Sequence, residues 1–262
     1  MMVPFRLGAT SYIIPADILS NVRYLAGRVQ DVELVLFDLE NGQSNLPTPA
    51  EISALKALAG QHGLSFTVHL PLDLRMDDDG GPGHISLEKA RKVIDCTRDL
   101  APWAYVAHLD GRAVLPPGTP PADFQHWQAA SIQALELVGA WAGGMQQVAL
   151  ENLEGYPLDF HAGVLARSAV SRAVDIGHLW LDGHDPLVTL REALPRTRVV
   201  HIHGLQAGRD HGSLAHVPAA GLRAVLDLLT RARYTGVLTL EIFSEEDFLG
   251  SMEVLSLNLP KS

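Results

Sequence analysis

Short apolar runs alternate with longer helical patterns along the whole chain, and this alternation restricts the fold more than any other feature of the sequence. Each run has the apolar and β-branched composition of a buried strand, and each is followed by turn residues and a stretch with helical periodicity. The eight predicted strands span residues 5–9, 32–37, 65–70, 104–108, 147–151, 171–174, 198–203 and 236–241. Their spacing leaves room for a loop and a crossover helix between consecutive parallel strands.

Eight such units without a linker predict one α/β domain over residues 1–262, a closed (β/α)8 TIM barrel. The nearly continuous apolar runs fit parallel strands that are covered on both faces. A doubly wound open sheet is the alternative, but it usually has a glycine-rich phosphate loop after its first strand, and residues 8–11 do not form one. Glu33 lies inside an apolar strand, where a buried carboxylate needs a partner, and we expect it to form a structural pair.

Capping residues and loop composition add local detail. Thr48 followed by Pro49 predicts an N-cap and a first helical turn, and Gly63 predicts the end of the same helix. Residues 73–84 and 110–122 are long polar or proline-rich loops after their strands. Such loops can form the rim of a site, and their composition is compatible with a solvated rim or with a lid.

The charge and composition of the chain limit which partners it can bind and where it is expected to be located. The chain has 30 acidic and 20 basic residues, a formal net charge of −10 and no basic run. An extended nucleic acid needs Lys and Arg for its phosphates, so we expect a small-molecule substrate instead. No apolar stretch approaches the length of a membrane span and the first ten residues lack signal-peptide features, so a cytoplasmic location is expected. The single cysteine, Cys96, excludes an intrachain disulfide and a thiolate metal cluster.

Histidine, aspartate and glutamate, the residue types that can bind metal ions here, occur repeatedly at the predicted strand ends. These ends all lie at one mouth of a TIM barrel. His201 and His203 are two apart in a strand, so both side chains point the same way. Asp175 ends its strand, and we interpret Gly177 as a turn that brings His178 back above the mouth. The candidate metal ligands are His69, His108, Glu151, Asp175, His178, His201, His203, Asp210, His211 and Glu241. This set predicts one to three divalent ions, Zn, Mn or Fe, bound by His, Asp and Glu.

Two kinds of chemistry fit these residues. Two or three neighbouring metals can bind a phosphoryl group, activate water and stabilise the leaving oxygen. In that reaction Glu151 and Glu241 would bridge metals or act as the base, and Arg209 would neutralise a phosphoryl oxygen. A single metal would instead suit a hydroxy-ketone, with the two glutamates moving a proton on and off carbon. The ligands of that single metal would be Glu151, Asp175, His201 and Glu241.

These residues resemble the metal ligands of the xylose isomerase-like barrel superfamily, and the resemblance covers most of the chain. Its endonuclease IV-like branch has the strand-end pattern His, His, Glu, Asp-x-x-His, His, Asp-x-His and Glu, and holds three zinc ions. The matching residues here are His69, His108, Glu151, Asp175, His178, His201, His211 and Glu241. The chain departs from this pattern because Asp210 is directly before His211, and Arg209 takes the usual aspartate position. His203 also replaces a residue that is often asparagine.

The sugar isomerase and epimerase branch is similar at the four single-metal ligands, but does not generally use ligands equivalent to His69 and His108. These two histidines favour phosphoester hydrolysis, and the net charge disfavours DNA as the substrate. Residues 7–15 and 31–37 resemble cobamide-remodelling phosphodiesterases, which cut the nucleotide loop of a corrinoid. The resemblance therefore implies a metal-dependent hydrolase of a phosphoester or phosphodiester in a small or cofactor-sized substrate. The alternatives are a divalent-metal sugar isomerase or epimerase and a non-catalytic ligand-binding barrel.

Overall fold

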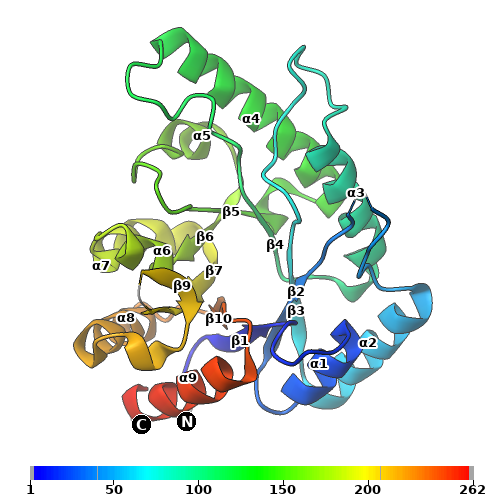
Figure 1. Ribbon diagram of the computed structural model, residues 1–262, viewed down its shortest axis with the longest axis vertical. Helices are drawn as coiled ribbons and strands as arrows, with labels where there is room; N and C mark the ends of the chain where they lie inside the picture. Colours follow the sequence, from blue (N-terminus) through cyan, green and yellow to red (C-terminus); the bar gives the residue numbers. More distant parts are fainter. Residues whose placement is uncertain (1–2, 40, 207, 260–262) are drawn as a thin grey trace.

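A closed barrel of eight parallel strands forms the centre of the computed structural model, which describes residues 3–39, 41–206 and 208–259 (Figure 1). The barrel strands are β1 (Arg6–Thr10), β2 (Asp31–Val35), β3 (Ser65–His69), β4 (Tyr105–Ala107), β5 (Val148–Glu151), β6 (Ser171–Asp175), β7 (Thr197–Ile202) and β10 (Val237–Leu240). They follow one another around the barrel in sequence order, and β10 pairs with β1 to close it. The predicted (β/α)8 TIM barrel is thus confirmed.

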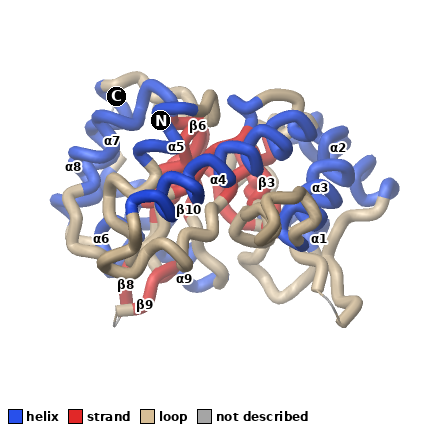
Figure 2. The backbone as a smooth tube through the Cα atoms, turned by 90° about the horizontal axis from the view of Figure 1, so that it is seen from above, coloured by secondary structure: helices blue, strands red, loops and turns tan. Residues whose placement is uncertain are grey.

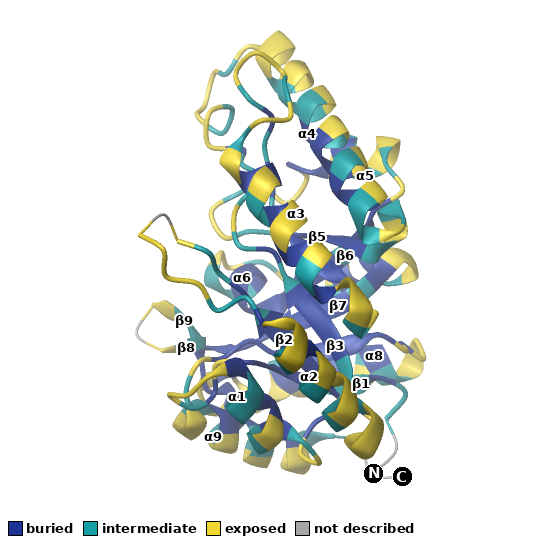
Figure 3. Cartoon of the chain, turned by 90° about the vertical axis from the view of Figure 1, so that its right-hand side faces the viewer, coloured by how far each residue is buried: buried dark blue, intermediate teal, exposed yellow. Residues whose placement is uncertain are grey.

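Helices surround the barrel, and their exposed faces point away from the buried strands (Figures 2 and 3). They are α1 (Ile18–Leu25), α2 (Pro49–His62), α3 (Ile85–Thr97), α4 (Pro121–Ala142), α5 (Ala162–Arg167), α6 (Ile176–Leu181), α7 (Pro186–Ala193), α8 (Ala219–Arg231) and α9 (Glu245–Asn258). In the described part of the chain, none of these helices combines the length and apolar character that crossing a membrane requires.

The start and end of α2 follow the predicted capping chemistry. The Thr48 side chain accepts a hydrogen bond from the backbone N–H of Glu51, and the Glu51 carboxylate accepts one from the backbone N–H of Thr48. Gly63 ends the helix in the left-handed conformation, which glycine adopts without a steric penalty. These local bonds define where α2 begins and ends.

Two kinds of side chain fill the inside of the barrel. A small apolar cluster lies within it, consisting of Ala104, Val106, Ala149, Ala173 and Val199. By contrast, β2 contributes two fully buried carboxylates, Asp31 and Glu33. The large apolar core lies between strands and helices, as in other barrels whose strands are covered on both faces. The interior is therefore apolar on the β4–β7 side and polar around β2.

The segment after β6 differs from its predicted form. Asp175 is the N-cap of α6, because its side chain accepts a hydrogen bond of 2.7 Å from the backbone N–H of His178. Gly177 lies inside this helix, so its interpretation as a turn was wrong. A Cβ atom at Gly177 would lie 2.0 Å from Cε1 of His203. Glycine is needed there because the His203 ring packs directly against the backbone of α6.

The segment after β7 forms an antiparallel hairpin rather than the predicted loop. Its strands are β8 (Gly204–Gln206) and β9 (Arg209–Gly212). The hairpin projects from the lower edge of the molecule in Figure 2, on the side where the barrel strands end. It thereby brings Asp210 and His211 to the mouth of the barrel.

Candidate metal centre

Four barrel strands bring residues at or next to their C-terminal ends together in one buried group. Potential ligand atoms of this group lie within 4.8 Å of one another, and we call it the central group: Glu151, Asp175, His201 and Glu241. His201 Nδ1 lies 2.8 Å from Glu151 Oε1 and 3.1 Å from Glu241 Oε2. It lies 3.9 Å from Asp175 Oδ2. All four residues are buried, so three carboxylates share a site that is largely shielded from solvent.

Glu33 determines how the His201 ring is presented. His201 Nε2 donates a hydrogen bond of 2.9 Å to Glu33 Oε2, and both side chains are fully buried. This bond leaves Nδ1 facing the carboxylates of the central group. A carboxylate behind a ligand histidine fixes the orientation of the ring and raises its basicity. The expected structural pair of Glu33 is therefore a pair with His201.

His69 and His108 form a second group with Glu151. His108 Nε2 donates a hydrogen bond of 3.0 Å to Glu151 Oε2, and His69 Nε2 lies 3.6 Å from the same oxygen. On its other side, His108 Nδ1 lies 3.3 Å from Asp73 Oδ1. Burial lowers the pKa of His108, but its bonds to Asp73 and Glu151 outweigh burial and raise that pKa to about 10. Glu151 thus links this group to the central group.

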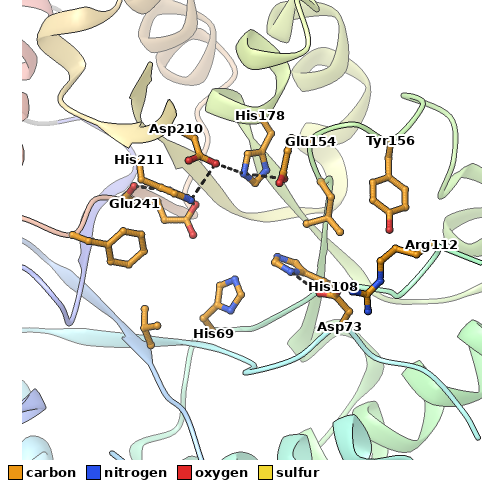
Figure 4. A pocket seen from close by; sticks show the side chains of 13 residues that line it. His69, Asp73, His108, Arg112, Glu154, Tyr156, His178, Asp210, His211 and Glu241 are labelled. Atoms are coloured by element: carbon orange, nitrogen blue, oxygen red, sulfur yellow. Dashed lines mark hydrogen bonds and ion pairs between the residues drawn. The ribbon is translucent and has the colours of Figure 1, made fainter. Parts of the chain in front are cut away.

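A third group lies on the opposite side of the cavity and consists of His178, Asp210 and His211 (Figure 4). Asp210 Oδ2 is 3.5 Å from His211 Nε2 and 3.9 Å from His178 Nε2. Beneath it, His203 Nε2 lies 3.3 Å from Asp175 Oδ1. Helix α6, the hairpin and the residue after β7 therefore bring His178, His211 and His203 to the edge of the central group.

The charges of the central group suit a cation. Burial raises the pKa of the Glu151 carboxyl, but His201 and His108 outweigh burial and hold that pKa well below its usual range. The pKa of Glu241 is likewise lowered, mainly by His201. Two buried oxygens, Asp175 Oδ2 and Glu241 Oε2, form no hydrogen bond within the described residues. Three carboxylates and one imidazole with unused oxygens fit the ligand preferences of Mn, Fe, Zn or Mg.

All ten predicted metal ligands lie in these groups or directly against them. Arg209, the predicted phosphate-neutralising residue, has an exposed side chain on β9 and does not line the cavity above the groups. That cavity has a volume of about 440 Å³. Sequence reasoning missed four polar residues that line it: Asp73, Arg112, Glu154 and Tyr156. The available signal was their position in loops that follow β3, β4 and β5.

Comparisons with known proteins identify the fold family. A family model described as a xylose isomerase-like TIM barrel matches residues 29–257. Proteins of curated function give no match. Among solved structures, the fold is similar to a D-tagatose 3-epimerase-like protein, with 17% identity, a TM-score of 0.73 and 97% of each chain covered. It is also similar to 3-keto-D-glucoside 4-epimerase from E. coli, with 16% identity, a TM-score of 0.66 and 97% of this chain and 98% of that chain covered.

A third similar structure is L-ribulose 3-epimerase, with 20% identity and a TM-score of 0.62, where 98% of this chain and 89% of that chain are covered. Two of these neighbours are named as sugar epimerases and the first as epimerase-like, so the leading prediction of phosphoester hydrolysis, including its cobamide version, is wrong.

The phosphoester prediction rested on treating His69 and His108 as ligands that call for more than one ion. His108 donates a hydrogen bond to Glu151, and His69 lies beside the same carboxylate. An imidazole can make such contacts whether or not it also binds a metal, so the two histidines do not by themselves require a second ion. The closed parallel barrel and the family match over residues 29–257 agree, and the chain belongs to the xylose isomerase-like TIM barrel family.

Proposed function

We propose that this chain is a divalent-metal-dependent isomerase or epimerase that acts on a sugar with a hydroxy-ketone. The observation that carries this proposal is the central group, in which two glutamates flank a shared site. Glu151 comes from β5 and Glu241 from β10, and β6 and β7 separate these strands in the barrel. The two carboxylates therefore approach a bound substrate from different sides. The epimerase activities named for the similar structures support the same class of reaction.

The central group would hold the essential ion through Glu151, Asp175, His201 and Glu241. Such an ion would polarise the ketone and the neighbouring hydroxyl of the sugar. The second group, with His69 and His108, and the third group, with Asp210, offer further places for ions, so we infer one to three ions per chain. One ion, in the central group, is the number that the proposed reaction needs.

The two glutamates would carry the proton. One carboxylate would accept the proton from the carbon next to the ketone, and the C–H electron pair would pass into an enediolate. The other glutamate, after taking a proton from solvent water, would deliver that proton to the opposite face of the carbon and restore the ketone, while the first glutamate would release its proton to solvent. Because the pKa of each carboxyl is lowered, both groups are ionised at neutral pH and able to accept a proton.

Residues around the glutamates would position them. His108 Nε2 and His201 Nδ1 contact different oxygens of Glu151, which restricts rotation of its carboxylate. His178 lines the cavity and is available to bind a substrate hydroxyl. The predicted role of Arg209, neutralising a phosphoryl oxygen, does not arise in this reaction, because the proposed sugar substrate has no phosphoryl group at the reacting carbon.

Deuterium exchange tests the proposal. The protein is loaded with Mn²⁺, Co²⁺, Mg²⁺ or Zn²⁺, its metal content per chain is measured, and a panel of ketoses is incubated with it in D₂O. We expect deuterium at the carbon next to the ketone, and Glu151→Gln or Glu241→Gln to reduce exchange at least about 100-fold. Glu136→Gln, at an exposed position on α4, is the matched control. No exchange from a protein with measured bound metal would overturn the proposal.

A further inference from the structure

Two cavities open side by side at the mouth of the barrel. The first lies above the central group, and Val35 and Phe243 are among its apolar lining residues. The second has a volume of about 370 Å³ and lies between the loops that follow β1 and β2, with Tyr12, Asn45 and Leu46 in its wall. The first cavity alone has the size of a site for a drug-sized ligand, so a free monosaccharide does not need the second one.

Backbone contacts join the walls of the two cavities. The Thr10 hydroxyl donates a hydrogen bond to the carbonyl of Ile242, next to Phe243. Ser11 Oγ accepts a hydrogen bond of 3.0 Å from the backbone N–H of Val35, and Tyr12 follows directly in the chain. From the second cavity, the Asn45 side chain donates a hydrogen bond of 2.9 Å to the Val35 carbonyl. The second cavity is therefore adjacent to the first, with Val35 in the wall between them.

Large apolar side chains are exposed in the segments that follow four neighbouring barrel strands. We call them the apolar rim: Tyr12, Leu39, Leu72 and Phe243, which are 38%, 46%, 40% and 43% exposed. They follow β1, β2, β3 and β10, which are consecutive neighbours in the barrel. Phe243 also packs edge-on against His211, with ring centroids 5.1 Å apart. An exposed apolar arc that begins at a polar site marks a surface that a ligand covers.

The second cavity suits an uncharged group. No Lys or Arg is among its described lining residues. Its two carboxylates already have partners, since Asp17 caps α1 and Glu51 takes part in the capping box of α2. Across the mouth, Arg112 contacts Asp110 through two hydrogen bonds. The path along the apolar rim therefore offers aromatic and aliphatic contacts without a charge partner for a phosphate.

We propose that the substrate is a sugar conjugate, whose sugar reacts at the central group while an uncharged, largely aromatic or apolar substituent lies along the apolar rim and in the second cavity. This inference rests on the proposed sugar isomerase or epimerase function. Tyr12 and Phe243 are then specificity-determining residues, which contact the substituent and leave the chemistry at the central group unchanged.

Matched ketose ethers test the inference. The metal-loaded protein is titrated calorimetrically with 6-O-benzyl-D-fructose and 6-O-methyl-D-fructose, which have the same hydroxy-ketone. We expect the benzyl ether to bind about five- to tenfold more tightly, because stacking on Tyr12 or Phe243 contributes that much. Tyr12→Ala and Phe243→Ala should remove most of this preference, whereas Leu257→Ala, an exposed position at the end of α9, should preserve it. In exchange assays Tyr12→Ala, which lies outside the first cavity, should raise KM for the benzyl ether and leave kcat unchanged.

Equal affinity for the two ethers would overturn the inference, as would an equal loss for both in Tyr12→Ala. The rim could instead cover a second copy of the chain, and sedimentation would then show a dimer that Tyr12→Ala and Phe243→Ala dissociate, which also overturns the inference. Failure of the proposed function has a different signature. In that case no ketose exchanges deuterium, while the calorimetric preference for the benzyl ether, or its absence, is still measured.

Discussion

At the scale of single residues, Glu33 has the clearest effect on the metal centre without being a candidate ligand. It accepts a hydrogen bond from His201 Nε2, so it fixes which nitrogen faces the other ligands. Glu33→Gln preserves the shape of the side chain and removes its charge. We expect the affinity for Mn²⁺ to fall about 10- to 100-fold, as for other residues behind a ligand histidine. A competition titration with a chelator measures this, with Glu136→Gln as the surface control; unchanged affinity would contradict the role of Glu33.

Asp31 is the second buried carboxylate of β2, and it makes stability depend on pH. Burial raises its pKa to about 6, against lowering contributions from Ser65, Thr67 and Arg6. Because the folded pKa lies above the unfolded value, the contribution of this group to stability is present below about pH 4 and is lost as pH rises through about 6. The loss is on the order of 2–3 kcal/mol.

Asp31→Asn should remove this loss because the amide stays neutral. At pH 8 the variant should melt several degrees above the parent protein, and near pH 4 the two melting temperatures should converge. Thermal denaturation at several pH values measures the difference. Asp99→Asn, at an exposed position, should follow the parent protein throughout. A variant less stable than the parent at pH 8 would show that the Asp31 carboxylate stabilises the fold.

At the scale of elements, α6 can pack against His203, the residue after β7, because Gly177 in α6 has no side chain. An added Cβ at Gly177 would meet the His203 ring, whereas an added Cβ at Gly221 in α8 would meet nothing within 4 Å. Both glycines are helical, so intrinsic propensity alone favours alanine by about 1 kcal/mol at each. We expect Gly221→Ala to stabilise the protein, while Gly177→Ala should destabilise it and weaken metal binding by displacing His203. Equal melting temperatures for the two variants would contradict this packing argument.

The elements also differ in how far they could be predicted from the sequence. Barrel strands and long helices repeat a pattern, so Glu151 and Glu241 could be placed at strand ends from the chain alone. Helix α6 has only six residues, too few for a helical period to emerge. The β8–β9 hairpin lacks the alternating apolar pattern that would predict two strands. Asp73 reaches the cavity because Leu74 pairs with Leu109 in the next loop, a tertiary contact that no local pattern encodes.

At the scale of the whole molecule, the barrel concentrates negative charge at one mouth of a chain whose net charge is already −10. The ion pairs of Glu151, Asp175 and Glu241 within the described residues are all with histidines. Burying three carboxylates with imidazoles as their only counter-charges is costly, since desolvation disfavours each charged form. A divalent ion in the central group would offset this cost in the folded state alone.

Bound metal should therefore stabilise the fold as a whole. At a free Mn²⁺ concentration about 100 times Kd, linkage contributes about 2.7 kcal/mol, which raises Tm by roughly 5–10 °C for a chain of this size. Chelator treatment should lower Tm and re-addition of Mn²⁺ should restore it in a concentration-dependent way. Asp175→Asn should abolish most of the Mn²⁺ response, because its carboxylate contacts both His201 and His203. If Tm is instead insensitive to chelator and to Mn²⁺ in the parent protein, the buried carboxylates are neutralised by the histidines alone, and the central group is not a metal site.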